Sequence, residues 1–191
     1  MSARPAYAVV GLALLALIWL LPDSAAPRFP LHMLRHMVLV ALAAPLLVLG
    51  FPRLGRLMAM PALLATGLEL LLVWGWHLPA AHGAAYRMPT AFVLEQATFL
   101  LVGLFVWAGC LHGPRLVGAG GLLLTSMHMT LLGALLTLAP RDLYAQFCGT
   151  PPDPEGQAVG GMLMLAIGTP IYLLAGVALA ARALSDREAA I

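Results

Sequence analysis

The feature that most limits how this chain can fold is a series of long apolar segments separated by short breaks. The segments cover roughly residues 5–21, 30–50, 58–77, 90–111, 116–138 and 157–181, and proline, glycine or charged residues separate them. A helix needs about 20 apolar residues to cross roughly 30 Å of hydrocarbon. The pattern therefore predicts an all-α, polytopic membrane helix bundle with about six transmembrane helices.

Composition agrees with this prediction. Hydrophobic residues make up 62% of the chain and charged residues 9%, and the mean hydropathy is +0.94, well outside the range of soluble domains. Six spans use most of the 191 residues. No repeat or change in composition marks a second unit, so we expect a single transmembrane domain over residues 1–191, with the lipid bilayer as its surroundings.

Charge and motifs exclude several functions. The formal charge of +2 arises from ten basic and eight acidic residues, without the basic stretch that tracks nucleic-acid phosphates, so we expect no nucleic-acid partner. The chain has no Gly-x-Ser-x-Gly turn, HExxH helix or phosphate-binding loop. We therefore expect a protein that is not an enzyme.

Arginine distribution predicts the orientation, because short cytoplasmic loops carry the excess of positive charge. If both termini are cytoplasmic, three arginines fall outside, namely Arg28, Arg87 and Arg141, with Arg35 just inside the second segment. Six then fall on the cytoplasmic side, namely Arg4, Arg53, Arg56, Arg115, Arg182 and Arg187. We therefore expect a multi-pass protein with both termini in the cytoplasm.

Ionisable side chains within the apolar segments are costly and therefore indicate function. On this topology most of them lie in the outer half of the membrane: His32, His36, Glu69, His77, Glu95 and His128. Their one-sided distribution indicates a site near the outer surface.

The second segment also predicts the chemistry of this site. Residues four apart share a helix face, so His32 lies above His36, and Met33 lies above Met37 on the adjacent stripe. The fifth segment adds a Met-His-Met triplet. Imidazole with thioether suits copper, particularly Cu(I), better than zinc or calcium. The predicted metal ligands are His32, His36, His77, His128, Met33, Met37, Met127 and Met129.

Other interpretations of these residues remain open. Methionine often fills gaps in a core, and a membrane histidine often hydrogen-bonds across helices or anchors a helix at the interface. Glu69 and Glu95 either pair with Arg35 or accept hydrogen bonds from the histidines and so orient them, and we favour the second role for Glu95. We expect His82 in a hydrated loop.

Five stretches, taken together, resemble one family. In chain order they are HMLRHMVLVALAAPLLVLGFP, WGWHLP, EQATFLLVGLFVW, LAPRDLY and GGMLMLAIGTPIYLLAG, and they cover most of residues 31 to about 176. These stretches are similar to the CtaG-type cytochrome c oxidase assembly factors of bacterial inner membranes. Each stretch is weak alone, and their order carries the resemblance.

The resemblance implies an inner-membrane protein that handles copper during maturation of a haem-copper oxidase. By position, it assigns the site to His36 with His32, to His77 and to Glu95. Two departures stand out: Gln96 occupies a position where the family usually has histidine, and EGQAVGG replaces an Asp-Gln pair before the last span. The triplet Met127, His128 and Met129 is one candidate to replace the missing ligand.

The predicted function is a membrane-embedded, copper-binding assembly factor that delivers copper to a cytochrome c oxidase subunit. Another copper chaperone is a further candidate partner. Two alternatives stay open: a haem-b membrane cytochrome with ligands such as His36 and His128, and a copper or proton-linked transporter. Small residues such as Gly118, Gly120 and Gly121 would also allow close helix contacts in a homodimer.

Overall fold

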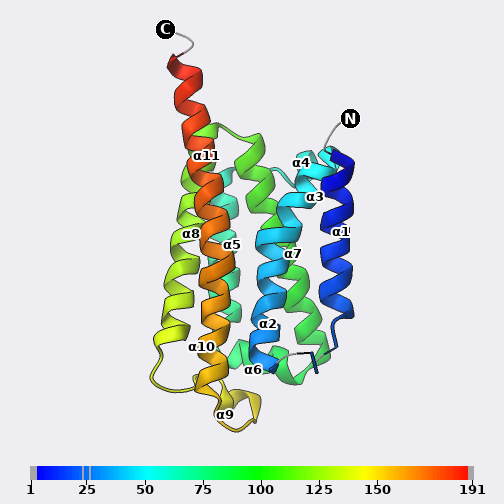
Figure 1. The fold of residues 1–191 in the computed structure, drawn as a ribbon, viewed down its shortest axis with the longest axis vertical. Helices are drawn as coiled ribbons and strands as arrows, with labels where there is room; N and C mark the ends of the chain where they lie inside the picture. The colour runs from blue at the N-terminus through cyan, green and yellow to red at the C-terminus, as the bar shows by residue number, and fades with distance from the viewer. Residues whose placement is uncertain (1–3, 23, 26, 189–191) are drawn as a thin grey trace.

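The computed structural model describes residues 4–22, 24–25 and 27–188, and within these ranges it contains helices and connecting turns but no strand. Figure 1 shows the main helices running side by side along the long axis, which confirms the predicted all-α bundle. The elements are α1 (Arg4–Leu20), α2 (Arg28–Met37), η1 (Val38–Ala43), α3 (Ala44–Gly50), α4 (Pro52–Met58), α5 (Ala62–Trp76), α6 (Pro79–Arg87), α7 (Pro89–His112), α8 (Arg115–Leu138), α9 (Ala145–Cys148), α10 (Pro154–Leu163), η2 (Met164–Gly168) and α11 (Thr169–Glu188).

Four continuous helices are long and apolar enough to cross a membrane: Arg28–Gly50, Pro89–His112, Arg115–Leu138 and Pro154–Asp186. Helices α4 and α5 form a fifth candidate, bent by 82°. The apolar helix α1 is shorter, at 17 residues. The prediction of about six spans agrees with this arrangement when α1 is counted.

Two predicted boundaries differ from the structure. The third apolar segment breaks between Met58 and Ala62, where Pro61 precedes the first residue of α5 and cannot donate a helical hydrogen bond. The expected loop between the third and fourth segments contains α6, a nine-residue helix that begins with Pro79. Proline is favoured at this first helical position because its φ angle is already helical.

The second span contains a π-helical segment, η1, that ties three helices together. The carbonyl oxygen of Val40 accepts hydrogen bonds from Trp107 Nε1 at 2.8 Å and from the Tyr172 hydroxyl at 2.9 Å. The two aromatic rings stack with centroids 5.1 Å apart. A π-helical turn changes the backbone hydrogen-bond pattern, and here side chains from α7 and α11 bond to one of its carbonyls.

The ends of the bundle differ. Figure 1 shows that α1 begins, and α11 ends, at the same end of the bundle, while the start of α2 lies at the opposite end with α6 and α9. The arrangement is consistent with termini on one side of the membrane. It gathers the beginning of α2, α6 and the beginning of α7 at the other end, where three of the predicted histidines lie, namely His32, His36 and His77.

We predict that Tyr172→Phe lowers the stability of the bundle. The substitution keeps the stacked ring but removes one of the two donors to the buried Val40 carbonyl, which should cost about 1 kcal/mol. Thermal unfolding in detergent, followed by circular dichroism, measures the change. Tyr7→Phe is the matched control because Tyr7 is exposed on α1, and an equal effect of both substitutions would contradict the role of the Tyr172 hydroxyl.

Candidate metal centre

Four histidines and one glutamate meet at the end of the bundle that holds α6. His32 and His36 come from α2, His77 follows α5, His82 lies in α6 and Glu95 in α7. The imidazole centroids form a row, with His77 to His36 at 5.6 Å, His36 to His32 at 4.4 Å and His32 to His82 at 4.7 Å. All five residues are buried. The spacing of one helical turn in α2 thus places two imidazoles in one cluster, as predicted.

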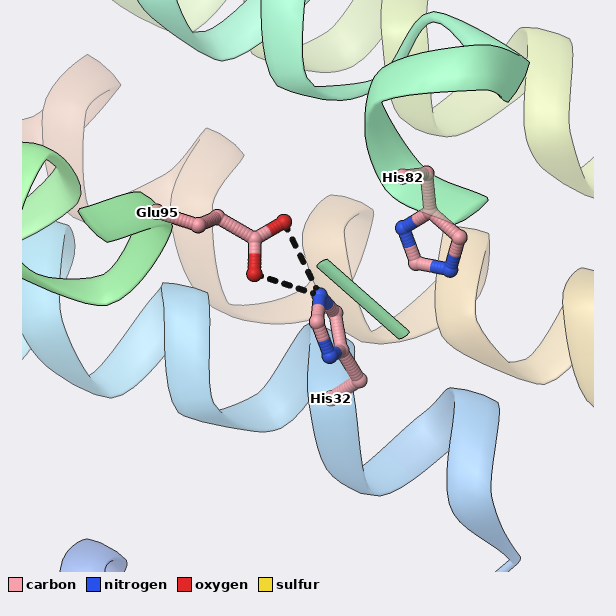
Figure 2. Close-up of side chains that lie close together, drawn as sticks. All are labelled: His32, His82 and Glu95. Atoms are coloured by element: carbon pink, nitrogen blue, oxygen red, sulfur yellow. Dashed lines mark hydrogen bonds and ion pairs between the residues drawn. The ribbon is translucent and has the colours of Figure 1, made fainter. Parts of the chain in front are cut away.

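Glu95 joins this row from the side. The two carboxylate oxygens, Oε1 and Oε2, lie 3.1 Å and 3.0 Å from His32 Nε2, and Figure 2 shows both contacts. One ligand atom from each of His32, His82 and Glu95 can be chosen so that all three lie within 4.8 Å of one another. Such a group could hold a metal ion, with the carboxylate serving either as a ligand or as the acceptor that orients His32.

His36 occupies the centre of the row. Its ring stacks on Phe99 with centroids 3.9 Å apart and an interplanar angle of 10°. Its Nε2 lies 3.4 Å from Glu95 Oε2, within ion-pair distance, but neither ring nitrogen makes a hydrogen bond among the described residues. A fully buried imidazole without a hydrogen bond is costly, so the two ring nitrogens of His36 are candidate contacts for a bound group.

His77 has a defined tautomer. Its Nδ1 donates a hydrogen bond of 2.7 Å to the carbonyl of Val73, one turn earlier, which leaves the lone pair on Nε2. No described residue contacts that Nε2 through a hydrogen bond. Burial lowers the pKa of His77 to about 3, and nearby His36 adds to the shift. His77 is therefore neutral at physiological pH, and its Nε2 carries an available lone pair.

His82 corrects our prediction of a hydrated loop, since only 1% of its surface is exposed. It lies in α6 and packs against Tyr144, at 4.5 Å between centroids, and against Phe29, at 5.2 Å. Burial lowers the pKa of His82 well below its ordinary value, and His32 contributes to the shift. The sequence signal for the helix that carries it is Pro79, because proline is favoured at the first helical position.

The loop that covers this cluster is organised by polar side chains. Asp142 accepts hydrogen bonds from the backbone of Tyr144, Ala145 and Asp153 at 2.7, 2.9 and 2.8 Å. Tyr144 in turn donates from its hydroxyl to the carbonyl of His77 at 3.0 Å. Asp142 therefore links the loop to the histidine row through Tyr144.

The methionines occupy other positions than predicted. Met33 and Met37 are fully buried, but they pack beside Gly160 and Gly168 on the side of α2 that faces α10 and η2. Met129 is also buried near Gly168, whereas Met127 is 68% exposed. Consecutive helix residues point about 100° apart, so the predicted Met-His-Met triplet cannot face one ion together.

His128 and Glu69 form a separate buried pair. His128 Nε2 lies 2.7 Å from Glu69 Oε2, and Thr125 donates to the same oxygen at 3.3 Å. Glu69 precedes His77 by eight residues of α5, or about 12 Å along a helix axis. The structure thus divides the predicted set between His32, His36, His77 and Glu95 at the bundle end and His128 with Glu69 deeper in the bundle.

The family model described as "Cytochrome c oxidase caa3 assembly factor" (Caa3_CtaG) matches residues 2–186. The chain belongs to this family. It is a cytochrome c oxidase assembly factor of the membrane, as the resemblance implied, and its association with the oxidase follows from that role.

No curated protein and no solved structure matches the chain. The contribution of individual residues therefore rests on the geometry. The fold brings together the residues that the resemblance to the CtaG family assigned to a site, namely His32, His36, His77 and Glu95. Gln96, where the resemblance implied a histidine, donates to Glu95 Oε2 at 3.0 Å. This amide supports the carboxylate rather than adding an imidazole.

We predict that Asp142→Ala loosens the loop over the histidine row. Three backbone N–H groups lose their acceptor, which should destabilise the fold by about 1–3 kcal/mol. Hydrogen exchange followed by mass spectrometry should show faster exchange across residues 142–153. Asp186→Ala is the control, because Asp186 pairs with Arg115 on the exposed surface far along α11. Unchanged exchange in Asp142→Ala would show that the loop is held by other contacts.

Proposed function

We propose that this assembly factor binds one copper(I) ion in the cluster of His32, His36, His77, His82 and Glu95 and passes it to a subunit of cytochrome c oxidase. The observation that supports this most directly is the convergence of His32, His82 and Glu95, with ligand atoms within 4.8 Å, in a buried cluster. His36 and His77 add unpartnered nitrogens beside it. The family role supplies the recipient.

Charge balance favours a monovalent cation. Imidazoles with one carboxylate suit Cu(II) and zinc as well as Cu(I). However, Glu95 is the one acidic residue that contacts the described histidine row, and its side chain is completely buried. A single carboxylate offsets one positive charge, and an unbalanced charge in a dry interior is strongly unfavourable. Cu(I) therefore fits this cluster better than a divalent ion.

Location also fits a delivery role. With both termini in the cytoplasm of a bacterium, as the arginine distribution predicts, the cluster lies at the outer end of the bundle in the inner membrane. There it would meet a copper chaperone as donor and the oxidase subunit as recipient. A site near the surface shortens the path that a cation must travel through a medium of low dielectric constant.

The haem-b alternative fits the geometry less well. Two axial imidazoles need a flat slot between them for the porphyrin, but neighbouring rings in this row contact each other directly, and Phe99 stacks on His36. The adjoining cavity, of about 550 Å³, is lined by His32 but by none of the other three histidines. A Soret band in the purified protein would nevertheless reverse this ranking.

We predict that His36→Ala and His82→Ala each lower the affinity for Cu(I). Loss of a ligand should weaken binding by at least roughly tenfold, because loss of a residue that only orients a ligand already weakens metal binding by about 10–100-fold. Anaerobic competition with a chromophoric Cu(I) chelator measures this change. Circular dichroism should show that both variants remain folded.

Two variants control this experiment. His112→Ala removes a histidine from the opposite end of α7, and Met127→Ala removes an exposed thioether. Both should bind copper as the wild type does. If His128→Ala alone abolished binding while His36→Ala and His82→Ala had no effect, the copper site would have to be moved to the deeper pair.

A further inference from the structure

A separate cavity of about 550 Å³ opens beside the histidine row. It lies between the last residues of α1, α2, the end of α6 and the start of α7, and His32 forms part of its wall. Beside small and aliphatic residues, its lining contains three arginines and three aromatic residues, namely Arg28, Arg35, Arg87, Trp19, Tyr86 and Phe92. The histidine row itself does not account for this basic and aromatic lining.

Two of the guanidinium groups form no ion pair with a carboxylate among the residues whose side chains the structure describes. The Arg28 guanidinium lies 3.9 Å above the centre of the Tyr86 ring, and Arg87 donates from Nε to the carbonyl of Gly83 at 3.1 Å. No ion pair joins either arginine to a carboxylate of residues 4–22, 24–25 or 27–186, although Arg28 also lines a smaller pocket together with Asp142 and Asp153. Like charges that share a cavity repel each other, so an anion bound between them would be stabilised.

The lining indicates which anion this is. Guanidinium groups bind phosphate through paired, charge-assisted hydrogen bonds. Trp and Tyr are typical of the level of the lipid headgroups. Beside the cavity, the apolar side chains of Leu17, Leu20 and Val93 are more than half exposed, as expected for helix faces that contact acyl chains.

We infer that this cavity binds the phosphate group of a phospholipid, whose acyl chains lie along the exposed faces of α1 and α7. Arg28 and Arg87 hold the phosphate oxygens, and Trp19 and Tyr86 flank the headgroup. The bound phosphate adds negative charge beside His32, where the arginines otherwise repel an approaching cation. Lipid binding at this position is independent of which metal, if any, the histidine row takes.

The test compares wild-type protein with the double variant Arg28→Gln/Arg87→Gln. Both are delipidated in detergent, titrated with a short-chain phosphatidylglycerol and examined by native mass spectrometry. The wild type should bind about one lipid, and the variant should bind it roughly tenfold more weakly or worse, because it loses two charged hydrogen-bond donors. The matched control is Arg141→Gln/Arg182→Gln, which removes the same charge from two exposed arginines that do not line the cavity.

A second titration with inorganic phosphate separates the two sources of this chemistry. Displacement of the lipid by millimolar phosphate would support the site and show that the headgroup phosphate supplies most of the affinity. Failure of phosphate to compete, with the variant still impaired, would support a site that needs the whole phospholipid. Equal lipid binding by the wild type and both variants, all with unchanged circular dichroism spectra, would overturn the inference.

Discussion

The contact between Glu95 and the histidines of α2 is the interaction on which the organisation of this bundle end depends. A carboxylate on the second turn of a membrane helix is unfavourable unless other groups neutralise it or bond to it. His32, His36 and Gln96 surround Glu95 from two helices. Helices α2 and α7 must therefore meet in one register, and the imidazoles come together as a consequence of satisfying that carboxylate.

The deeper pair of Glu69 and His128 follows the same rule with a different result. The carboxylate is completely buried and contacts one imidazole and one hydroxyl. Only Glu69 and His128 could act as strong ligands here, whereas the bundle end offers five such residues. Thr66 and Cys110 lie further along, beside Gly121. Because the cluster at the bundle end and the Glu69–His128 pair are separated by about two helical turns, they form distinct groups.

Much of this site could be predicted from the sequence, because helical periodicity determines which of its residues share a face. The spacing of four residues predicted that His32 and His36 share a face, and the cost of burial predicted that Glu95 would find histidine partners. Helix rotation was harder to predict, since a fully apolar segment has little amphipathic pattern. For that reason Met127, which is exposed, could not be distinguished from buried Met129. His82 was missed because its burial depends on Tyr144 and Phe29, which are distant in the chain.

If the row holds a cation as proposed, its hydrogen bonds indicate how that cation would also be released. His77 is fixed by Val73 and presents one nitrogen, whereas His32 can bond either to Glu95 or to a cation. Without a cation, His32 Nε2 donates to the Glu95 carboxylate. In the proposed loaded form the same carboxylate would instead offset the charge of the cation in the low-dielectric interior. Exchange of this kind demands little rearrangement of the helices, in accordance with a protein whose role is to assist assembly of another.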